Sequence, residues 1–197
     1  MDDDFSSIWM EVGLPNKKKI LVCNFYREHQ YLKQADNSSL APNEQLNRWK
    51  LFLNQWERAL GTGKECLVLG DSNIDHLLIN ATDISKSRHS ALITELSDKV
   101  YPHGVKQCVT GFTHSRQGQR DTLIDVLYTN APQKLSSVQA VTRGASDHKI
   151  LSTVRHSKNI VQRADIRRKE ATNTLMKVCF WKKFVKSADG MFIDQQM

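Results

Sequence analysis

The chain has 197 residues, which suits one domain with an attached tail and is enough to bury a hydrophobic core. Its 40% content of hydrophobic residues argues against global disorder. Its net charge of +7 is concentrated in residues 157–197, which indicates either attraction to polyanions such as nucleic acid or a solvated helical face. No stretch approaches the roughly 20 apolar residues of a membrane span, and the acidic start is unlike a signal peptide, so we expect an intracellular protein, nuclear or cytoplasmic, with no membrane partner.

The first half of the chain predicts a hairpin followed by a helix. Residues 5–12 and 19–27 each read as a strand, with a turn at residues 15–17 and a long polar loop after the second strand. Across residues 43–60, apolar side chains recur at spacings of three and four, which predicts a helix that covers the sheet. The apolar stripe of this helix consists of Leu46, Trp49, Leu53, Trp56 and Leu60.

The stretch that follows contains the sequence Gly-Asp-Ser-Asn directly after an apolar run. Residues 66–69 predict a short buried strand, and Gly70 allows an unusual backbone conformation at its end. If the chain stays extended, Asp71 and Asn73 point the same way and present a carboxylate beside an amide. The alternative is a capping loop in which both side chains only satisfy backbone groups.

The second half predicts one helix and four strands. The predicted helix spans residues 88–96, and the predicted strands span residues 105–111, 122–128, 136–142 and 149–154.

Three of the four cysteines, Cys23, Cys66 and Cys108, lie in strand-like apolar runs, which favours buried thiols over disulfides or a zinc site.

Two further acidic positions stand out. Asp125 lies inside the predicted strand 122–128, where a charged carboxylate is costly unless it is paired, although an outward-facing position is the simpler interpretation. Asp147-His148 precedes the last strand, and a histidine ring is a natural partner for a carboxylate.

Taken in order, these motifs resemble the endonuclease/exonuclease/phosphatase superfamily, and most of all the endonuclease domains of non-LTR retrotransposons. The resemblance covers residues 5–156 and rests on the ordered set rather than on any single motif. The motifs are Asn24-Phe25-Tyr26-Arg27, Gly70-Asp71-Ser72-Asn73, Thr113-His114-Ser115-Arg116, Thr122-Leu123-Ile124-Asp125, Tyr128-Thr129-Asn130 and Ser146-Asp147-His148.

The resemblance implies metal-assisted cleavage of a phosphodiester in DNA, with Mg²⁺ or Mn²⁺ as cofactor. In this interpretation Asp71 activates the attacking water with help from Asn73, and His148, oriented by Asp125, donates to the scissile phosphate. The match to Tyr26 hydrogen-bonds a phosphate oxygen, and the match to Asp147 lies at the metal site. Contacts to the nucleic acid are expected from Arg27, His114 and Arg116.

The fold implied is α+β, a four-layer α/β/β/α sandwich of the deoxyribonuclease-like type. The family's first strands supply an Asn and a metal-binding Glu that are missing here, so we expect an N-terminally truncated domain with exposed strand edges. Glu11 matches a different part of the fold and does not take over the metal role.

Residues 157–197 are expected to form a basic, helical tail or a linker. They carry nine Lys or Arg against four Asp or Glu, a balance of +5. Residues 181–184 combine aromatic and basic side chains, which suits nucleic-acid binding. They also suit the start of a linker to a reverse transcriptase domain in a full-length relative.

Three functions remain open at this stage. The first is a retrotransposon-derived DNA endonuclease. The second is a catalytically inert remnant that at most binds nucleic acid through its basic tail. The third is a phosphatase acting on phosphoinositides or sphingolipids, which the motif around residues 124–130 favours less.

Overall fold

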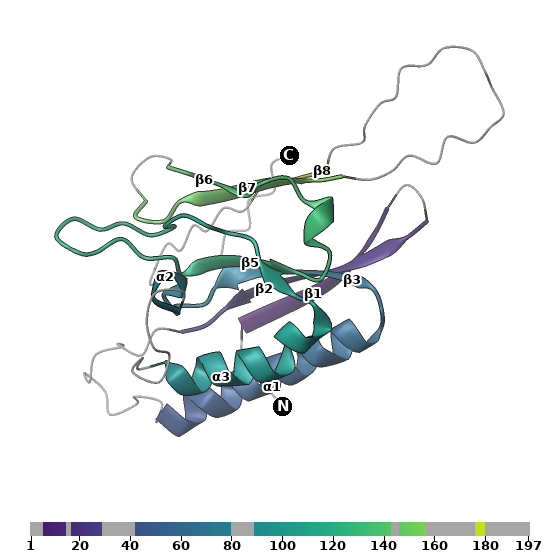
Figure 1. Cartoon of the computed structure of the whole chain (residues 1–197), viewed down its shortest axis with the longest axis horizontal. Helices are drawn as coiled ribbons and strands as arrows, with labels where there is room; N and C mark the ends of the chain where they lie inside the picture. The colour runs from purple at the N-terminus through teal and green to yellow at the C-terminus, as the bar shows by residue number, and fades with distance from the viewer. Residues whose placement is uncertain are drawn as a thin grey trace, which may run out of the picture.

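The structure is a computed structural model, and it describes residues 6–14, 17–28, 42–79, 89–142, 146–156 and 176–179 of the chain. Figure 1 shows two sheets and a helical layer. The elements are β1 (Ser6–Gly13), β2 (Lys19–Tyr26), α1 (Pro42–Gly61), β3 (Glu65–Asp71), α2 (His76–Ile79), α3 (Ser90–Lys99), η2 (Tyr101–His103), β4 (Lys106–Gln107), β5 (Asp125–Thr129), η3 (Pro132–Lys134), β6 (Gln139–Val141), β7 (Ile150–Arg155) and β8 (Met176–Cys179).

The larger sheet has the strand order β1-β2-β3-β5-β4, and the smaller sheet has the order β6-β7-β8. Strands β2 and β3 run parallel, whereas the other neighbouring pairs are antiparallel. Helices α1 and α3 cover one face of the larger sheet, and the smaller sheet lies on its other face (Figure 1). The mixed α/β sandwich expected from the sequence is therefore present, and within the described ranges its layers run α/β/β.

The helix predicted at residues 43–60 is confirmed as α1, and it supplies most of the core on its side of the sheet. Its stripe buries Trp49, Leu53 and Trp56 completely or nearly so. The Trp49 indole packs against Phe25 of β2 and donates to the carbonyl of Leu92 in α3, 3.0 Å away. The aromatic stripe is thus structural, because the packing of Trp49 on β2 and its hydrogen bond to α3 join the two helices to the sheet.

The hairpin predicted at residues 5–12 and 19–27 is confirmed as β1 and β2. Strand β1 is an edge strand of the larger sheet, and it exposes Ile8 and Met10 to solvent. The thiols of Cys23 and Cys66 are buried as expected, and burial raises their pKa values to about 12 and about 11.

Three predicted strands are at least two residues shorter than expected, and of residues 136–142 only Gln139–Val141 form strand β6. Of residues 105–111 only Lys106–Gln107 form a strand. The backbone N–H of Val109 donates to Oε1 of the Gln107 side chain, not to a carbonyl of a neighbouring strand. Of residues 122–128 only the part from Asp125 onward is strand, because β3 ends at Asp71, the partner of Asp125, and the backbone N–H of Ile124 donates to the Thr113 hydroxyl oxygen.

The helical expectation for the tail is wrong at residues 176–179, which pair with β7 as strand β8. The other residues of the segment 157–197 lie outside the described part of the chain. Within the described residues, no helix combines the length and the apolar character needed to cross a bilayer.

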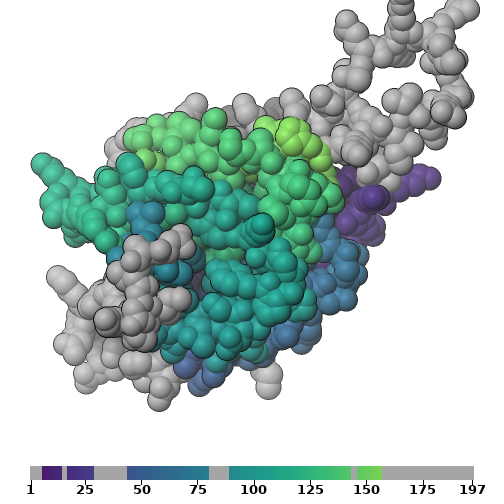
Figure 2. Space-filling model, viewed as in Figure 1, coloured from purple at the N-terminus to yellow at the C-terminus, as the bar shows by residue number. Residues whose placement is uncertain are grey.

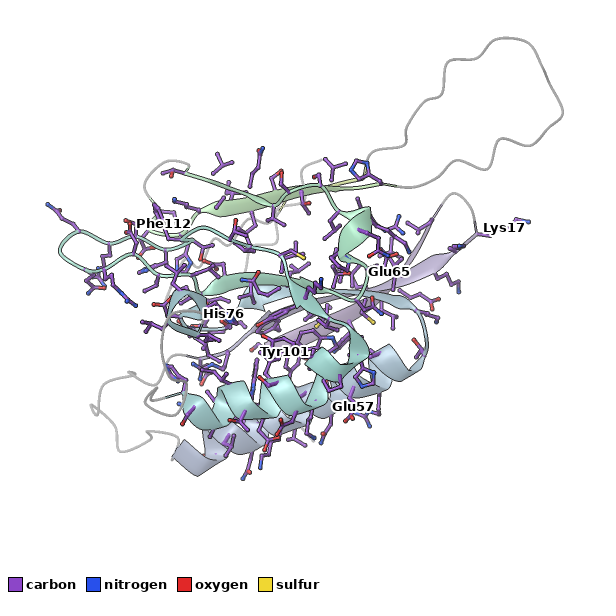
Figure 3. All side chains as sticks on the ribbon, viewed as in Figure 1. Lys17, Glu57, Glu65, His76, Tyr101 and Phe112 are labelled. Carbon is purple, nitrogen blue, oxygen red and sulfur yellow. The ribbon has the colours of Figure 1, made fainter. Side chains whose placement is uncertain are left out.

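A buried ion pair joins the two sheets at the start of β3. Glu65 receives two hydrogen bonds from the Arg155 guanidinium of β7, at 2.7 and 2.8 Å, and a third from Lys134 at 2.7 Å. Its labelled position between the sheets is visible in Figure 3. Burial raises the pKa of Glu65, but the bonds from Arg155 and Lys134 outweigh it and hold the pKa below its ordinary value of 4.5. The pair therefore fixes how β7 lies on β3.

We expect Glu65→Gln to lower the free energy of unfolding by about 3 kcal/mol, because the variant leaves the Arg155 charge buried without its counter-charge. Urea denaturation followed by circular dichroism measures this difference. The matched control is Glu57→Gln, an exposed position on α1 for which we expect a change within about 0.5 kcal/mol.

The same ion pair makes stability depend on pH. Since the folded pKa of Glu65 is lowered, its contribution is present above pH 4.5 and is lost as the pH falls through the lowered value. The stability difference between the wild type and Glu65→Gln should therefore shrink below pH 4.5. A difference that stays constant down to pH 3 would contradict this role.

Candidate active site

Three predicted site residues lie in one row across the larger sheet. In the strand register, Tyr26 of β2 pairs with Asp71 of β3, and Asp71 pairs with Asp125 of β5. Paired residues in neighbouring strands direct their side chains to the same face of a sheet. Asp71 is the last residue of β3 and Asp125 is the first residue of β5, so the two carboxylates meet at one end of the sheet.

His148 reaches this row from the segment that enters β7. Its Nδ1 lies 2.9 Å from Oδ2 of Asp125, and both side chains are half-buried. Asp71, Asp125 and His148 form one cluster in which a ligand atom from each lies within 4.8 Å of the others. Asp125 lies at the first position of its strand rather than inside it as expected, and from there it contacts His148 on the segment that leads into β7.

Thr113 holds Asp125 in place. Its fully buried hydroxyl oxygen accepts the backbone N–H of Asp125 at 2.9 Å and that of Ile124 at 3.1 Å. Its carbonyl accepts the backbone N–H of Lys149 at 2.7 Å, next to His148. Thr113 therefore ties both members of the Asp125–His148 pair to one residue. We did not predict this role, although Thr113 belongs to one of the motifs that carry the resemblance.

The turn after β3 differs from the extended arrangement expected for Asp71 and Asn73. Asn73 has a φ of 49°, and its backbone N–H donates to Oδ1 of Asp71 at 2.9 Å, which closes an Asx turn. The Asn73 amide donates to the carbonyl of Arg27 at 2.6 Å. Both side chains thus satisfy backbone groups, as the capping alternative states, while Asp71 also lies in the cluster with His148.

Arg27 is a buried clamp on this turn. Its guanidinium donates to the carbonyl of Ser72 at 2.5 Å and to that of Asn73 at 2.9 Å, and the residue is only 4% exposed. Its backbone N–H donates to the carbonyl of Asp71. This placement makes Arg27 a residue that positions the turn, and its expected contact with nucleic acid stays a prediction.

Tyr26 lies beside the same turn. Burial and the nearby Asp71 carboxylate raise the pKa of its phenol, and a hydrogen bond with the Asn73 side chain partly opposes this. The raised pKa means that the Tyr26 phenol is protonated at neutral pH, so its oxygen carries a hydrogen beside the Asp71 carboxylate.

The remaining predicted residues lie on and beside the loop that projects from the sheet next to Phe112, which Figure 3 labels. Arg116 is exposed on this loop. His114 contacts the His148 ring edge to face, with a centroid distance of 4.8 Å, and its Nε2 lies 3.3 Å from Oδ2 of Asp147. Asp147 is about half exposed, and it joins His114 and His148 in a second cluster.

The residues of the two clusters supply ligand atoms of the type that the expected divalent ion binds. Carboxylate oxygens of Asp71 and Asp125 lie near His148 in the first cluster and that of Asp147 does so in the second, and oxygen ligands suit Mg²⁺ or Mn²⁺. Among the described residues, neither cluster contains a glutamate. Glu11 pairs with Lys19 and Lys64, and these hydrogen bonds lower its pKa to about 2.

Asn130, from another of the motifs, has a purely architectural position. Its amide oxygen accepts the backbone N–H of Cys66 at 2.9 Å, and its amide nitrogen donates to the carbonyl of Lys64 at 3.0 Å. The side chain thereby joins the end of β5 to the start of β3, the strand that carries Asp71.

Comparison with known proteins agrees with this architecture. The fold is similar to that of the 3′ phosphatase NExo from Neisseria bound to product DNA hairpin, with a TM-score of 0.51, 13% identity and coverage of 72% of this chain and 62% of that chain. It is likewise similar to the 3′-5′ exonuclease NExo from Neisseria meningitidis, with a TM-score of 0.51, 14% identity and coverage of 75% and 70%. No family model and no curated protein sequence matches.

At these identities the similarity establishes the fold alone. The chain shares the α/β sandwich fold of these two solved proteins, which is the fold class that the sequence motifs predict. It spans 62% of the first of these solved chains, so activity, substrate and partners are matters for proposal.

Proposed function

We propose that this chain is a metal-dependent phosphodiesterase of the deoxyribonuclease-like type that hydrolyses a phosphodiester in DNA. The observation that carries the proposal is the 2.9 Å contact between His148 and Asp125 beside the Asp71 carboxylate. A carboxylate that holds one ring nitrogen fixes the tautomer and orientation of the imidazole, so that Nε2 faces the reacting group.

Each residue then has a definite task. Asp71 accepts a proton from the attacking water and orients it, while Tyr26 donates to a phosphate oxygen. His148 donates to the scissile phosphate, and Asp125 stabilises the charge on the ring. Mg²⁺ or Mn²⁺, held by Asp147 and the neighbouring carboxylates, would neutralise phosphate charge and lower the pKa of water.

The retrotransposon origin is part of the proposal. The ordered motifs from Tyr26 to His148 support it, as does the basic segment 157–197, which suits either DNA contact or a connection to a reverse transcriptase domain. Arg116 and His114, beside the cluster, are the proposed contacts to the DNA backbone.

The test is the nicking of supercoiled plasmid by the purified chain with Mg²⁺, Mn²⁺ or EDTA. We expect cleavage that needs the metal and that falls by about 10²–10⁴-fold in His148→Ala. The matched control is His103→Ala, an exposed histidine on η2, which should cleave like the wild type. Equal cleavage by the wild type and His148→Ala would end the catalytic assignment.

A second candidate is an inert protein that binds nucleic acid. The observation in its favour is that neither described carboxylate–histidine cluster contains a glutamate. It predicts DNA binding that weakens steeply with salt and no cleavage in any metal. Fluorescence anisotropy of labelled DNA at several salt concentrations measures this binding, and its absence at low salt would rule the candidate out.

A further inference from the structure

The second cluster has the chemistry of a different metal. His114, Asp147 and His148 supply two imidazoles and one carboxylate, with ligand atoms within 4.8 Å of one another. Imidazole nitrogens favour zinc and its transition-metal neighbours, whereas magnesium prefers oxygen ligands alone. A two-histidine, one-carboxylate set is therefore a poor magnesium site and a good zinc site.

The spacing of the donors fits a small tetrahedral ion. Ligands at about 2.0–2.1 Å from zinc lie about 3.4 Å from one another. Nε2 of His114 and Oδ2 of Asp147 are already 3.3 Å apart. The two imidazoles meet edge to face with centroids 4.8 Å apart, and a ligand atom of each residue in the set lies within 4.8 Å of the others.

Both rings also have the outer partners that zinc-binding histidines commonly have. Nδ1 of His148 contacts Oδ2 of Asp125 at 2.9 Å, and Nδ1 of His114 lies 3.4 Å from the hydroxyl of Thr122. A partner on Nδ1 fixes the tautomer and presents Nε2 to the metal. The backbone supports this arrangement, because His114 forms bridges with both Thr122 and His148.

We propose that His114, Asp147 and His148 form a zinc site that is separate in chemistry from the magnesium site of the proposed function. Zinc binds through Nε2 of each histidine and a carboxylate oxygen of Asp147, and water completes the tetrahedron. Because Asp147 and His148 serve both sites, bound zinc lowers magnesium-supported cleavage. This last consequence rests on the proposed function, whereas zinc binding itself does not.

The test titrates the full chain with Zn²⁺ by calorimetry and with Co²⁺ by visible absorption, in the absence of DNA. We expect one site per chain, a cobalt spectrum without thiolate bands, and a loss of affinity of at least about 10-fold in His114→Ala. The matched control is His103→Ala, with unchanged affinity. Equal affinity in the wild type, His114→Ala and Asp147→Ala would overturn the inference.

A second measurement needs no variant. Zn²⁺ should protect His114 and His148 of the wild-type chain from acylation by diethylpyrocarbonate, as read by mass spectrometry, and leave exposed His103 reactive. Equal labelling of His114 with and without zinc would contradict the site. A chain that binds zinc here yet never cleaves DNA would disprove the proposed function while sustaining the zinc site.

Discussion

Asp71→Asn should lower the rate of DNA cleavage by about 10³-fold and leave the fold as stable as the wild type, or slightly more stable. The asparagine side chain has nearly the same shape, and its oxygen can still accept the backbone N–H of Asn73, as Oδ1 of Asp71 does at 2.9 Å. It cannot accept a proton from water at neutral pH, so only the chemical step is lost.

The gain in stability has its own cause. Asp71 pairs directly with Asp125 across β3 and β5, and like charges in opposed positions destabilise a sheet by some tenths of a kcal/mol. Removing one charge relieves this repulsion. The row that brings the two carboxylates together is therefore expected to cost the fold some stability, which Asp71→Asn should recover while it keeps the turn at Asn73.

Single-turnover cleavage and urea denaturation of the same preparation measure the two effects. Asp98→Asn, an exposed position on α3, is the control and should change neither quantity. A variant that loses activity and stability together would show that Asp71 is needed for folding rather than for chemistry.

Gly70→Ala should destabilise the chain by about 4 kcal/mol or more. A Cβ added to Gly70 would lie 1.9 Å from the carbonyl oxygen of Phe25 and 2.8 Å from its carbonyl carbon. These are backbone atoms of β2, so no side-chain rotation relieves the clash. Gly70 also has a φ of 154°, a conformation that residues with a side chain rarely adopt.

The effect should extend to the site, because Gly70 and Phe25 are paired residues immediately before Asp71 and Tyr26. Strands β2 and β3 would have to separate at the point where they carry the row of site residues. We therefore expect an open or unfolded chain rather than a small local shift.

The measurement is urea denaturation of soluble protein, with hydrogen exchange of β2 and β3 if both states are populated. Gly61→Ala is the matched control, since an added Cβ there meets nothing within 4 Å. It should be neutral or stabilise by up to about 1 kcal/mol at the end of α1. A Gly70→Ala variant whose free energy of unfolding is within about 1 kcal/mol of the wild type would show that β2 and β3 can separate here without loss of stability.

Local sequence patterns were sufficient for much of the fold. The stripe from Leu46 to Leu60 predicted α1 and its place on the sheet, because the residues on the buried face of a helix recur every three to four positions. The apolar run at residues 66–69 likewise predicted the central strand β3. The ordered motifs also singled out residues such as Asp71, Asp125 and His148 before any contact between them was known.

What only the tertiary structure decided is how these residues meet. The pairing of Tyr26, Asp71 and Asp125 depends on the register of three strands, and the contact of His148 with Asp125 depends on one sheet lying against the other. The turn at Asn73 and the clamp by Arg27 are also contacts between distant segments. Periodicity reports only which face of its own element a residue occupies, and so it carries no information about register or about neighbours in another sheet.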